Sequence, residues 1–142
     1  MEPTSDLLSR DELGMQAMAT RLGISTEEVH QRESVGRLFS YLRCGRGERV
    51  YPAYQLAAEI YPDLLRTAVE ALTANGPLLD TFFNGCDCDL ADLRVREVLA
   101  GRSLVLRTLD KDAAWLLSLP MACRMQAVMG ALERLEAIVK GW

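Results

Sequence analysis

Histidine is almost absent from this sequence, which contains one, His30, among its 142 residues. Catalysis that needs paired histidines and most histidine-rich metal sites are therefore excluded. No glycine-rich phosphate loop occurs, and no nucleophile is matched by a base and an orienting group, so we expect neither an enzyme nor a cofactor. No apolar run is long enough to span a membrane, and the first residues lack the pattern of a signal peptide. We therefore expect a cytoplasmic protein without membrane contact.

The cysteines are unsuitably spaced for metal binding. The four cysteines are Cys44, Cys86, Cys88 and Cys123. Zinc knuckles place two residues between paired thiolates, whereas one residue separates Cys86 from Cys88 and no second pair exists. Asp87, Asp89 and Asp92 resemble the start of a calcium loop, but the glycine and the bidentate glutamate of such a loop are missing. We expect reduced thiols and no metal.

The net charge of −4 argues against a protein that coats nucleic acid nonspecifically. The charge is uneven, however. Residues 31–50 hold five arginines and two glutamates, a net charge of +3, which leaves −7 for the rest of the chain. Hydrophobic residues make up 49%, enough for a chain of this length to bury a core without disulfides or metal. The basic segment is a candidate contact for specific DNA.

Two capping boxes near the start predict consecutive helices. Ser9 with Glu12 predicts a helix over 10–22, and Ser25 with Glu28 predicts another over 26–35. Gly23 suits the left-handed residue that follows a helix end. Two helices joined by so short a turn form a helix-turn-helix.

The packing positions of a helix-turn-helix are partly filled by suitable residues. The motif needs a small residue in the first helix, a glycine in the turn and a branched apolar residue in the second helix. Ala19, Gly23 and Val29 stand at those places. A further apolar residue is usual three positions after Val29, and Arg32 stands there instead.

A basic hairpin follows the helix-turn-helix. Residues 38–43 and 49–51 suit strands, 45–48 suit a turn, and Pro52 ends the pairing, so we expect a head over residues 1–55. Such a winged head predicts duplex DNA binding, with the second helix in the major groove. The residues predicted to reach base edges are Thr26, His30, Gln31 and Arg32. Those predicted to contact DNA from the wing and its approach are Arg37, Arg43, Arg46 and Arg49.

Two carboxylates oppose this interpretation. Glu27 and Glu28 lie in the first turn of the second helix, where they suit the helix dipole but repel DNA phosphates. The alternative is a helical hairpin that serves packing or protein contact.

The remainder, residues 56–142, reads as a helical body. We expect helices over 62–73, 77–83 and 91–99, and periodicity does not decide between strand and helix over 103–109. A long amphipathic helix should begin after Pro120, with a heptad seam that favours dimerisation or partner binding. The predicted interface residues are Met121, Met125, Val128, Leu132, Leu135, Val139 and the terminal Trp142. The alternative is that this stripe is core. The fold class is thus mainly α.

Several segments resemble the Xre/MbcA/ParS-type antitoxin family, whose members pair with RES-type toxins. The matching runs are Arg21-Leu22-Gly23-Ile24-Ser25, Val35-Gly36-Arg37-Leu38-Phe39-Ser40 and Val50-Tyr51-Pro52-Ala53-Tyr54-Gln55-Leu56. Residues 78–101 resemble the toxin-binding region of the family, through Thr81-Phe82-Phe83-Asn84 and Val98-Leu99-Ala100-Gly101. The sequence departs from the family at 91–96, which replaces a Gly-Arg-Thr-Pro-like stretch, and at 102–142, which extends beyond the usual domain.

The resemblance implies a homo-oligomeric antitoxin that reads its own operator with the head and covers a toxin with the body. Neutralisation of this kind is steric and needs no chemistry from the antitoxin. The alternative hypothesis is an adaptor or oligomerisation protein that does not bind DNA and uses the same head for protein contacts.

Overall fold

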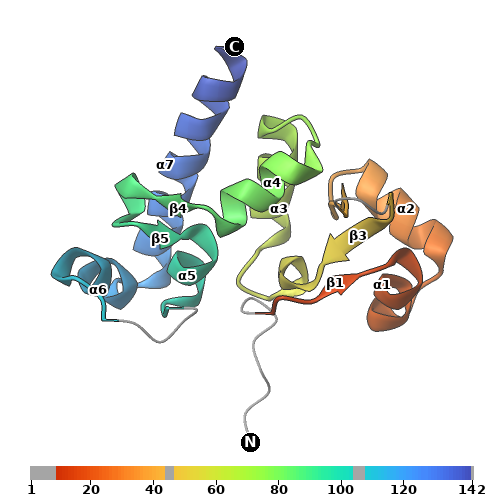
Figure 1. Cartoon of the computed structure of the whole chain (residues 1–142), viewed down its shortest axis with the longest axis horizontal. Helices are drawn as coiled ribbons and strands as arrows, with labels where there is room; N and C mark the ends of the chain where they lie inside the picture. The colour runs from red at the N-terminus through yellow and green to blue at the C-terminus, as the bar shows by residue number, and fades with distance from the viewer. Residues whose placement is uncertain (1–8, 44–46, 104–107, 142) are drawn as a thin grey trace, which may run out of the picture. The chain divides into compact units, whose positions relative to one another are not determined.

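The computed structural model describes residues 9–43, 47–103 and 108–141. Within these ranges the chain is mainly helical, with small antiparallel sheets and a long C-terminal helix (Figure 1), which confirms the expected fold class. The chain divides into two compact units, Met1–Leu79 and Asp80–Trp142. The boundary that we expected after residue 55 lies inside the first unit. No helix of the described ranges is long and apolar enough to cross a membrane.

The first unit begins with the helix-turn-helix and its hairpin. Helices α1 (Met15–Leu22) and α2 (Thr26–Ser34) pack on a three-stranded antiparallel sheet, as Figure 1 shows at the red and orange end of the chain. The strands are β1 (Glu12–Leu13), β2 (Tyr41–Leu42) and β3 (Arg49–Pro52), in the order β1-β3-β2. The expected hairpin is therefore present, and it gains a third strand on its far side.

The turn between α1 and α2 has the predicted geometry. Gly23 follows α1 with φ at 69°, the left-handed conformation that glycine adopts without strain. Ser25 caps α2 by accepting a hydrogen bond from the backbone N–H of Glu28. Ala19 and Val29 are buried in the core between the two helices. The Ser25 cap, which is one half of the second capping box, and the packing positions are thus confirmed.

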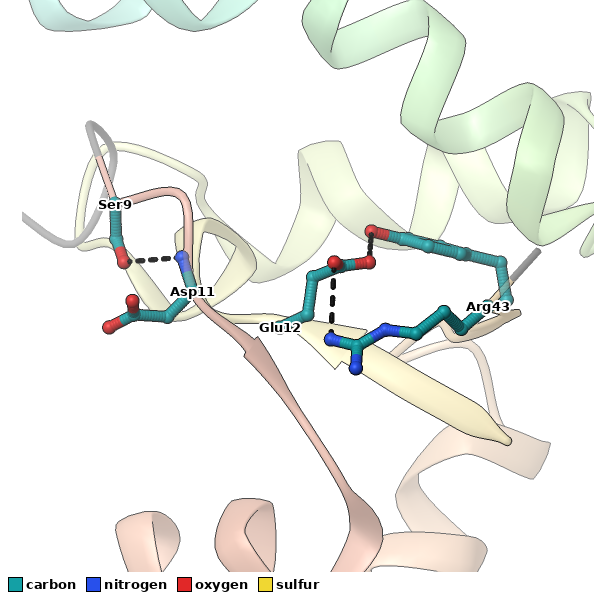
Figure 2. Close-up of polar contacts among 5 residues, drawn as sticks. Ser9, Asp11, Glu12 and Arg43 are labelled. Atoms are coloured by element: carbon teal, nitrogen blue, oxygen red, sulfur yellow. Dashed lines mark hydrogen bonds and ion pairs between the residues drawn. The ribbon is translucent and has the colours of Figure 1, made fainter. Parts of the chain in front are cut away.

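The first capping box was interpreted wrongly. The Ser9 hydroxyl accepts from the N–H of Asp11, two residues on, and Glu12 extends as part of β1, as Figure 2 shows. The helix begins only at Met15. Glu12 and Leu13 pair with Pro52 and Tyr51 of β3, residues about forty positions away, so the partner strand outweighs the local capping signal.

Two buried side chains connect the hairpin to the rest of the first unit. The Gln55 amide lies in the 3-10 helix η2 (Ala53–Leu56) and exchanges two hydrogen bonds with the backbone of Phe39, at 2.8 Å and 2.9 Å. The phenol of Tyr51 donates to Glu33 at 2.6 Å. The Tyr-Pro-x-x-Gln run noted in the sequence is therefore a set of buried internal contacts.

The first unit continues through α3 (Pro62–Ala71), and α4 (Gly76–Asn84) runs from it into the second unit. Both helices match their predicted positions within about two residues. The turn between them places Thr73 and Ala74 at positive φ, 56° each, although neither is glycine.

The second unit opens with a short hairpin that the sequence did not predict. Strands β4 (Cys86–Asp87) and β5 (Leu93–Arg94) pair around the 3-10 helix η3 (Cys88–Leu90). Helix α5 (Val95–Ala100) follows and ends at Gly101, with φ at 73°. The helix expected over 91–99 therefore has the right end but starts four residues too early, because its first residues complete the hairpin.

Two further helices close the second unit. Helix α6 (Lys111–Ser118) was not predicted, whereas α7 (Met121–Lys140), the long blue helix of Figure 1, begins directly after Pro120 as expected. The undecided segment 103–109 falls largely outside the described residues, except for Ser103, Thr108 and Leu109.

Arg124 holds α7 to the rest of its unit. Its Nη1 donates to the carbonyls of Val98 and Leu99 at the C-terminal end of α5, at 2.7 Å and 2.9 Å. Its Nε donates to the carbonyl of Leu119. A guanidinium at these carbonyls satisfies acceptors that the helix leaves open and favours the negative end of its dipole.

Candidate nucleic-acid interface

The outer face of α2 carries three of the four residues predicted to read bases. Thr26, His30 and Gln31 surround one shallow hollow of about 480 Å³, together with Glu27 and Met15. Positions 26, 30, 27 and 31 share one side of a helix with 3.6 residues per turn. His30 and Gln31 are exposed. The structure thus brings these side chains together in a position open to solvent.

Arg32 lies on another side of α2. Its Nε stands 3.6 Å from a carboxylate oxygen of Glu28, one turn earlier, and its side chain is 35% exposed. It lines a pocket with Leu22 and Leu38. The structure therefore does not bring Arg32 together with Thr26, His30 and Gln31.

Two of the wing arginines predicted to contact phosphates, Arg43 and Arg49, already have polar partners within the first unit. Arg43 lies 3.4 Å from a carboxylate oxygen of Glu12, and Figure 2 shows the two side chains meeting across the sheet. The phenol of Tyr41 donates to the same carboxylate at 2.6 Å. Arg49 donates to the Ser40 hydroxyl at 2.9 Å. Arg46 lies outside the described residues.

Arg37 lies three residues after the end of α2 and is exposed. Among the described residues, no hydrogen bond or ion pair engages its side chain. Of the described arginines predicted to contact DNA, Arg37 is therefore the one whose charge is least compensated by neighbouring groups.

A partly buried polar cluster fixes the orientation of α2. Glu33, in the last turn, accepts hydrogen bonds from Tyr51 on β3 and from Ser40, and Arg49 completes the cluster through Ser40. Burial, and then the neighbouring Glu33 carboxylate, raise the pKa of Tyr51 well above its usual value of 10.0. The phenol therefore stays protonated and keeps donating to Glu33.

The electrostatics of the outer face are mixed. Thr26, His30 and Gln31 offer hydrogen-bond donors and acceptors of the kind that contact base edges. The Glu27 carboxylate stands among them and repels phosphate. Recognition through this face would depend on hydrogen bonds, with cations contributed from the flanking segments.

The seam of α7 is divided between core and surface. Val128 and Leu132 are 0% and 2% exposed within the second unit. The half-buried members of the seam are Met121, Met125, Leu135 and Val139. Trp142 lies outside the described residues. A partner on this helix would therefore meet the ends of the seam, because its centre belongs to the unit's own core.

The second unit has two further surface features, and the first of them, an exposed tryptophan, was not predicted from the sequence. Trp115 on α6 is 64% exposed and lines a groove with Cys88 and Cys123, both free thiols. Asp87, Cys88 and Asp89 place one ligand atom each within 4.8 Å of one another. Asp89 is, however, paired with Arg134 at 2.8 Å, so one of these carboxylates already has a cation. The exposed tryptophan could have been found only by predicting α6.

Comparisons of the chain with known protein families, with curated proteins and with solved structures find no match.

Proposed function

We propose that this protein is an antitoxin-like transcriptional regulator. The head reads operator DNA through α2, and the second unit binds a protein partner without catalysing a reaction. The observation that carries the proposal is the outer face of α2, where the exposed side chains of His30 and Gln31 and the partly buried Thr26 lie together on the second helix of a helix-turn-helix. A cytoplasmic location, homo-oligomerisation and a toxin as the partner belong to the same proposal.

The second half of the resemblance gains one piece of support. Ala91 and Asp92 stand where the family has its Gly-Arg-Thr-Pro-like stretch, and both have positive φ, 55° and 62°. Glycine adopts this conformation most readily. The side chains of Ala91 and Asp92 thus differ from the family pattern. Their backbone nevertheless has a conformation that the glycine of the family's stretch would adopt readily.

The test is binding of the purified full chain to the promoter fragment of its own gene across a range of salt concentrations. We expect specific binding that weakens as salt rises, because arginines displace counterions from phosphates. Replacing both Arg43 and Arg49 by alanine should lower affinity and reduce the salt slope by about one per lost phosphate contact. Arg66→Ala, on the exposed surface of α3, is the matched control. Absence of salt-sensitive promoter binding would contradict the DNA part of the proposal.

A second function has its own support. Glu27 lies on the outer face of α2, and Arg43 is already paired with Glu12, both of which favour a protein-contact head over DNA. Under this adaptor hypothesis, the Arg43 and Arg49 substitutions change affinity for a protein partner. Binding to the promoter fragment is then no stronger than binding to unrelated DNA, with or without the substitutions. The neighbouring reading frame distinguishes the two, since a RES-like toxin beside this gene would support the antitoxin.

A further inference from the structure

A pocket of about 540 Å³ lies in the first unit, beside the C-terminal half of α2. Its walls are mostly apolar and come from α1, η2, α3 and the segments between them. The main apolar residues are Leu22, Leu38, Leu56, Ile60 and Leu65. This volume is typical of small-molecule sites, which span roughly 300–1,000 Å³ and combine apolar walls with a few polar groups.

Two guanidinium groups line this pocket. The α2 helix ends in a chain reversal at Gly36, with φ at 79°, and the N–H of Arg37 then donates to the carbonyl of Arg32 at 2.9 Å. The reversal places Arg37 beside the last turn of α2, and both arginines line the pocket. Among the residues that the structure describes, no aspartate or glutamate lines this pocket.

Arg32 has an unused donor. Its Nε is buried, and no acceptor within hydrogen-bond distance is present among the described residues. The nearest carboxylate oxygen, from Glu28, is 3.6 Å away, too far for a hydrogen bond. Most buried donors in proteins have an acceptor, so this one calls for an explanation.

The position of Arg32 in the helix-turn-helix is a second reason to expect a ligand beside its Nε. In a helix-turn-helix an apolar side chain usually fills this place and closes the core. Here the guanidinium lies beside leucines, and next to it is a space that no side chain of the described residues fills. The Gln55 amide, also in the lining, is occupied by Phe39 and Pro52 and does not supply the missing acceptor.

We propose that this pocket binds a carboxylate carried on an apolar group. The apolar part would lie against the leucines and Ile60, and the carboxylate would accept from Arg32 Nε and from Arg37. Guanidinium and carboxylate match in shape as well as charge. A phosphate of DNA fits less well, because it has no apolar body to cover the walls. The inference does not depend on DNA recognition by α2.

Such a carboxylate has two sources, a free apolar acid or the carboxyl terminus of a peptide. The experiment titrates the full ¹⁵N-labelled chain with four probes and follows amide shifts by NMR. The probes are octanoate, acetyl-leucyl-leucine with a free carboxylate, and their uncharged counterparts 1-octanol and acetyl-leucyl-leucinamide. Shifts at Leu22, Arg37 and Ile60 report occupancy of the pocket. We expect at least one carboxylate to bind about tenfold or more tightly than its uncharged counterpart, and the stronger of the two acids identifies the source.

Two substitutions locate the anion contact. Arg32→Met keeps an unbranched, mostly apolar side chain without the charge and should weaken carboxylate binding about tenfold or more, with binding of the uncharged probes retained. Arg37→Met gives a second reading if Arg32→Met fails to fold. Arg66→Met, outside the pocket, should leave binding unchanged. The proposal is overturned if neither acid shifts the lining residues, if the uncharged probes bind equally well, or if binding in a folded Arg32 or Arg37 variant equals that of the native chain.

Discussion

The phenol of Tyr51 on β3 donates a 2.6 Å hydrogen bond to Glu33 in the last turn of α2. This contact links the hairpin to the proposed DNA-reading helix. Tyr51→Phe leaves the partly buried carboxylate of Glu33 with one donor fewer. We expect the first unit to lose about 1–3 kcal/mol of unfolding free energy, measured by hydrogen exchange of amides in α2 and β3. Tyr61→Phe, at a half-exposed tyrosine, should change exchange little. Equal effects from both would show that the Tyr51 hydrogen bond contributes nothing particular.

Because the pKa of Tyr51 is raised, the stability of the first unit should fall at alkaline pH. The folded state holds the phenolic proton more tightly than the unfolded state, whose pKa is near 10.0. The resulting stability is present in full below that pKa and is lost as pH rises above it. Urea unfolding between about pH 8 and pH 11 should therefore show a fall that is smaller in Tyr51→Phe than in the native chain. A fall of the same size in both would remove Tyr51 as its cause.

Gly76 packs directly on the backbone of the first unit. A Cβ at this position would lie 1.9 Å from the carbonyl oxygen of Ser40, which cannot move aside as a flexible side chain can. Gly76→Ala should cost about 1–3 kcal/mol through overpacking, measured by thermal or urea unfolding. Gly14→Ala is the matched control, because no described residue beyond its chain neighbours has an atom within 4 Å of the Cβ that alanine would add. We expect the control to unfold like the native protein, and equal losses would contradict the close approach.

Arg124 should be far more important to the second unit than Arg134. Arg124 donates to three backbone carbonyls, on α5 and at the end of α6, whereas Arg134 makes an exposed ion pair with Asp89. Arg124→Met should lower stability by about 2 kcal/mol or more, because buried acceptors lose charged donors. Arg134→Met should change it by less than about 1 kcal/mol. Urea unfolding followed by tryptophan fluorescence measures both, and a larger loss in Arg134→Met would refute this ranking.

If α2 contacts DNA, its own carboxylate weakens that contact. Glu27→Gln removes a negative charge from the outer face and should raise promoter affinity severalfold, with a smaller gain at high salt. Glu70→Gln, at an exposed position on α3, is the matched control. Fluorescence anisotropy of a labelled promoter fragment measures both. An unchanged affinity in Glu27→Gln would mean that the outer face of α2 does not approach the phosphates.

Much of the first unit follows from local signals. The Ser25 cap, Gly23, and the small and branched residues Ala19 and Val29 act within a few positions of one another, so they define α2 and its turn without the rest of the fold. Arg32 was visible as a departure from the motif. Its unused donor was not, because the pocket walls come from segments that are distant in sequence.

The wrong helix start before α1 and the missed hairpin before α5 have a common physical origin. A capping box at Ser9 stabilises a helix by about 1 kcal/mol, and pairing of β1 with β3 supplies backbone hydrogen bonds to residues that the sequence window does not include. The β4–β5 hairpin before α5 was not predicted for the same reason, because its two strands pair across the intervening η3. The seam of α7 showed an apolar stripe, but periodicity is the same whether the stripe meets the chain's own core or a partner.

The sequence by itself determined a mainly helical chain with a helix-turn-helix, a basic hairpin and a long final helix, since these depend on nearest-neighbour spacing, caps and turns. Only the tertiary structure decided that Arg32 faces a pocket, that Glu12 and Arg43 meet across a sheet, and that Val128 and Leu132 are core. The direction in which a side chain points depends on what packs against its element. That information lies in residues far along the chain.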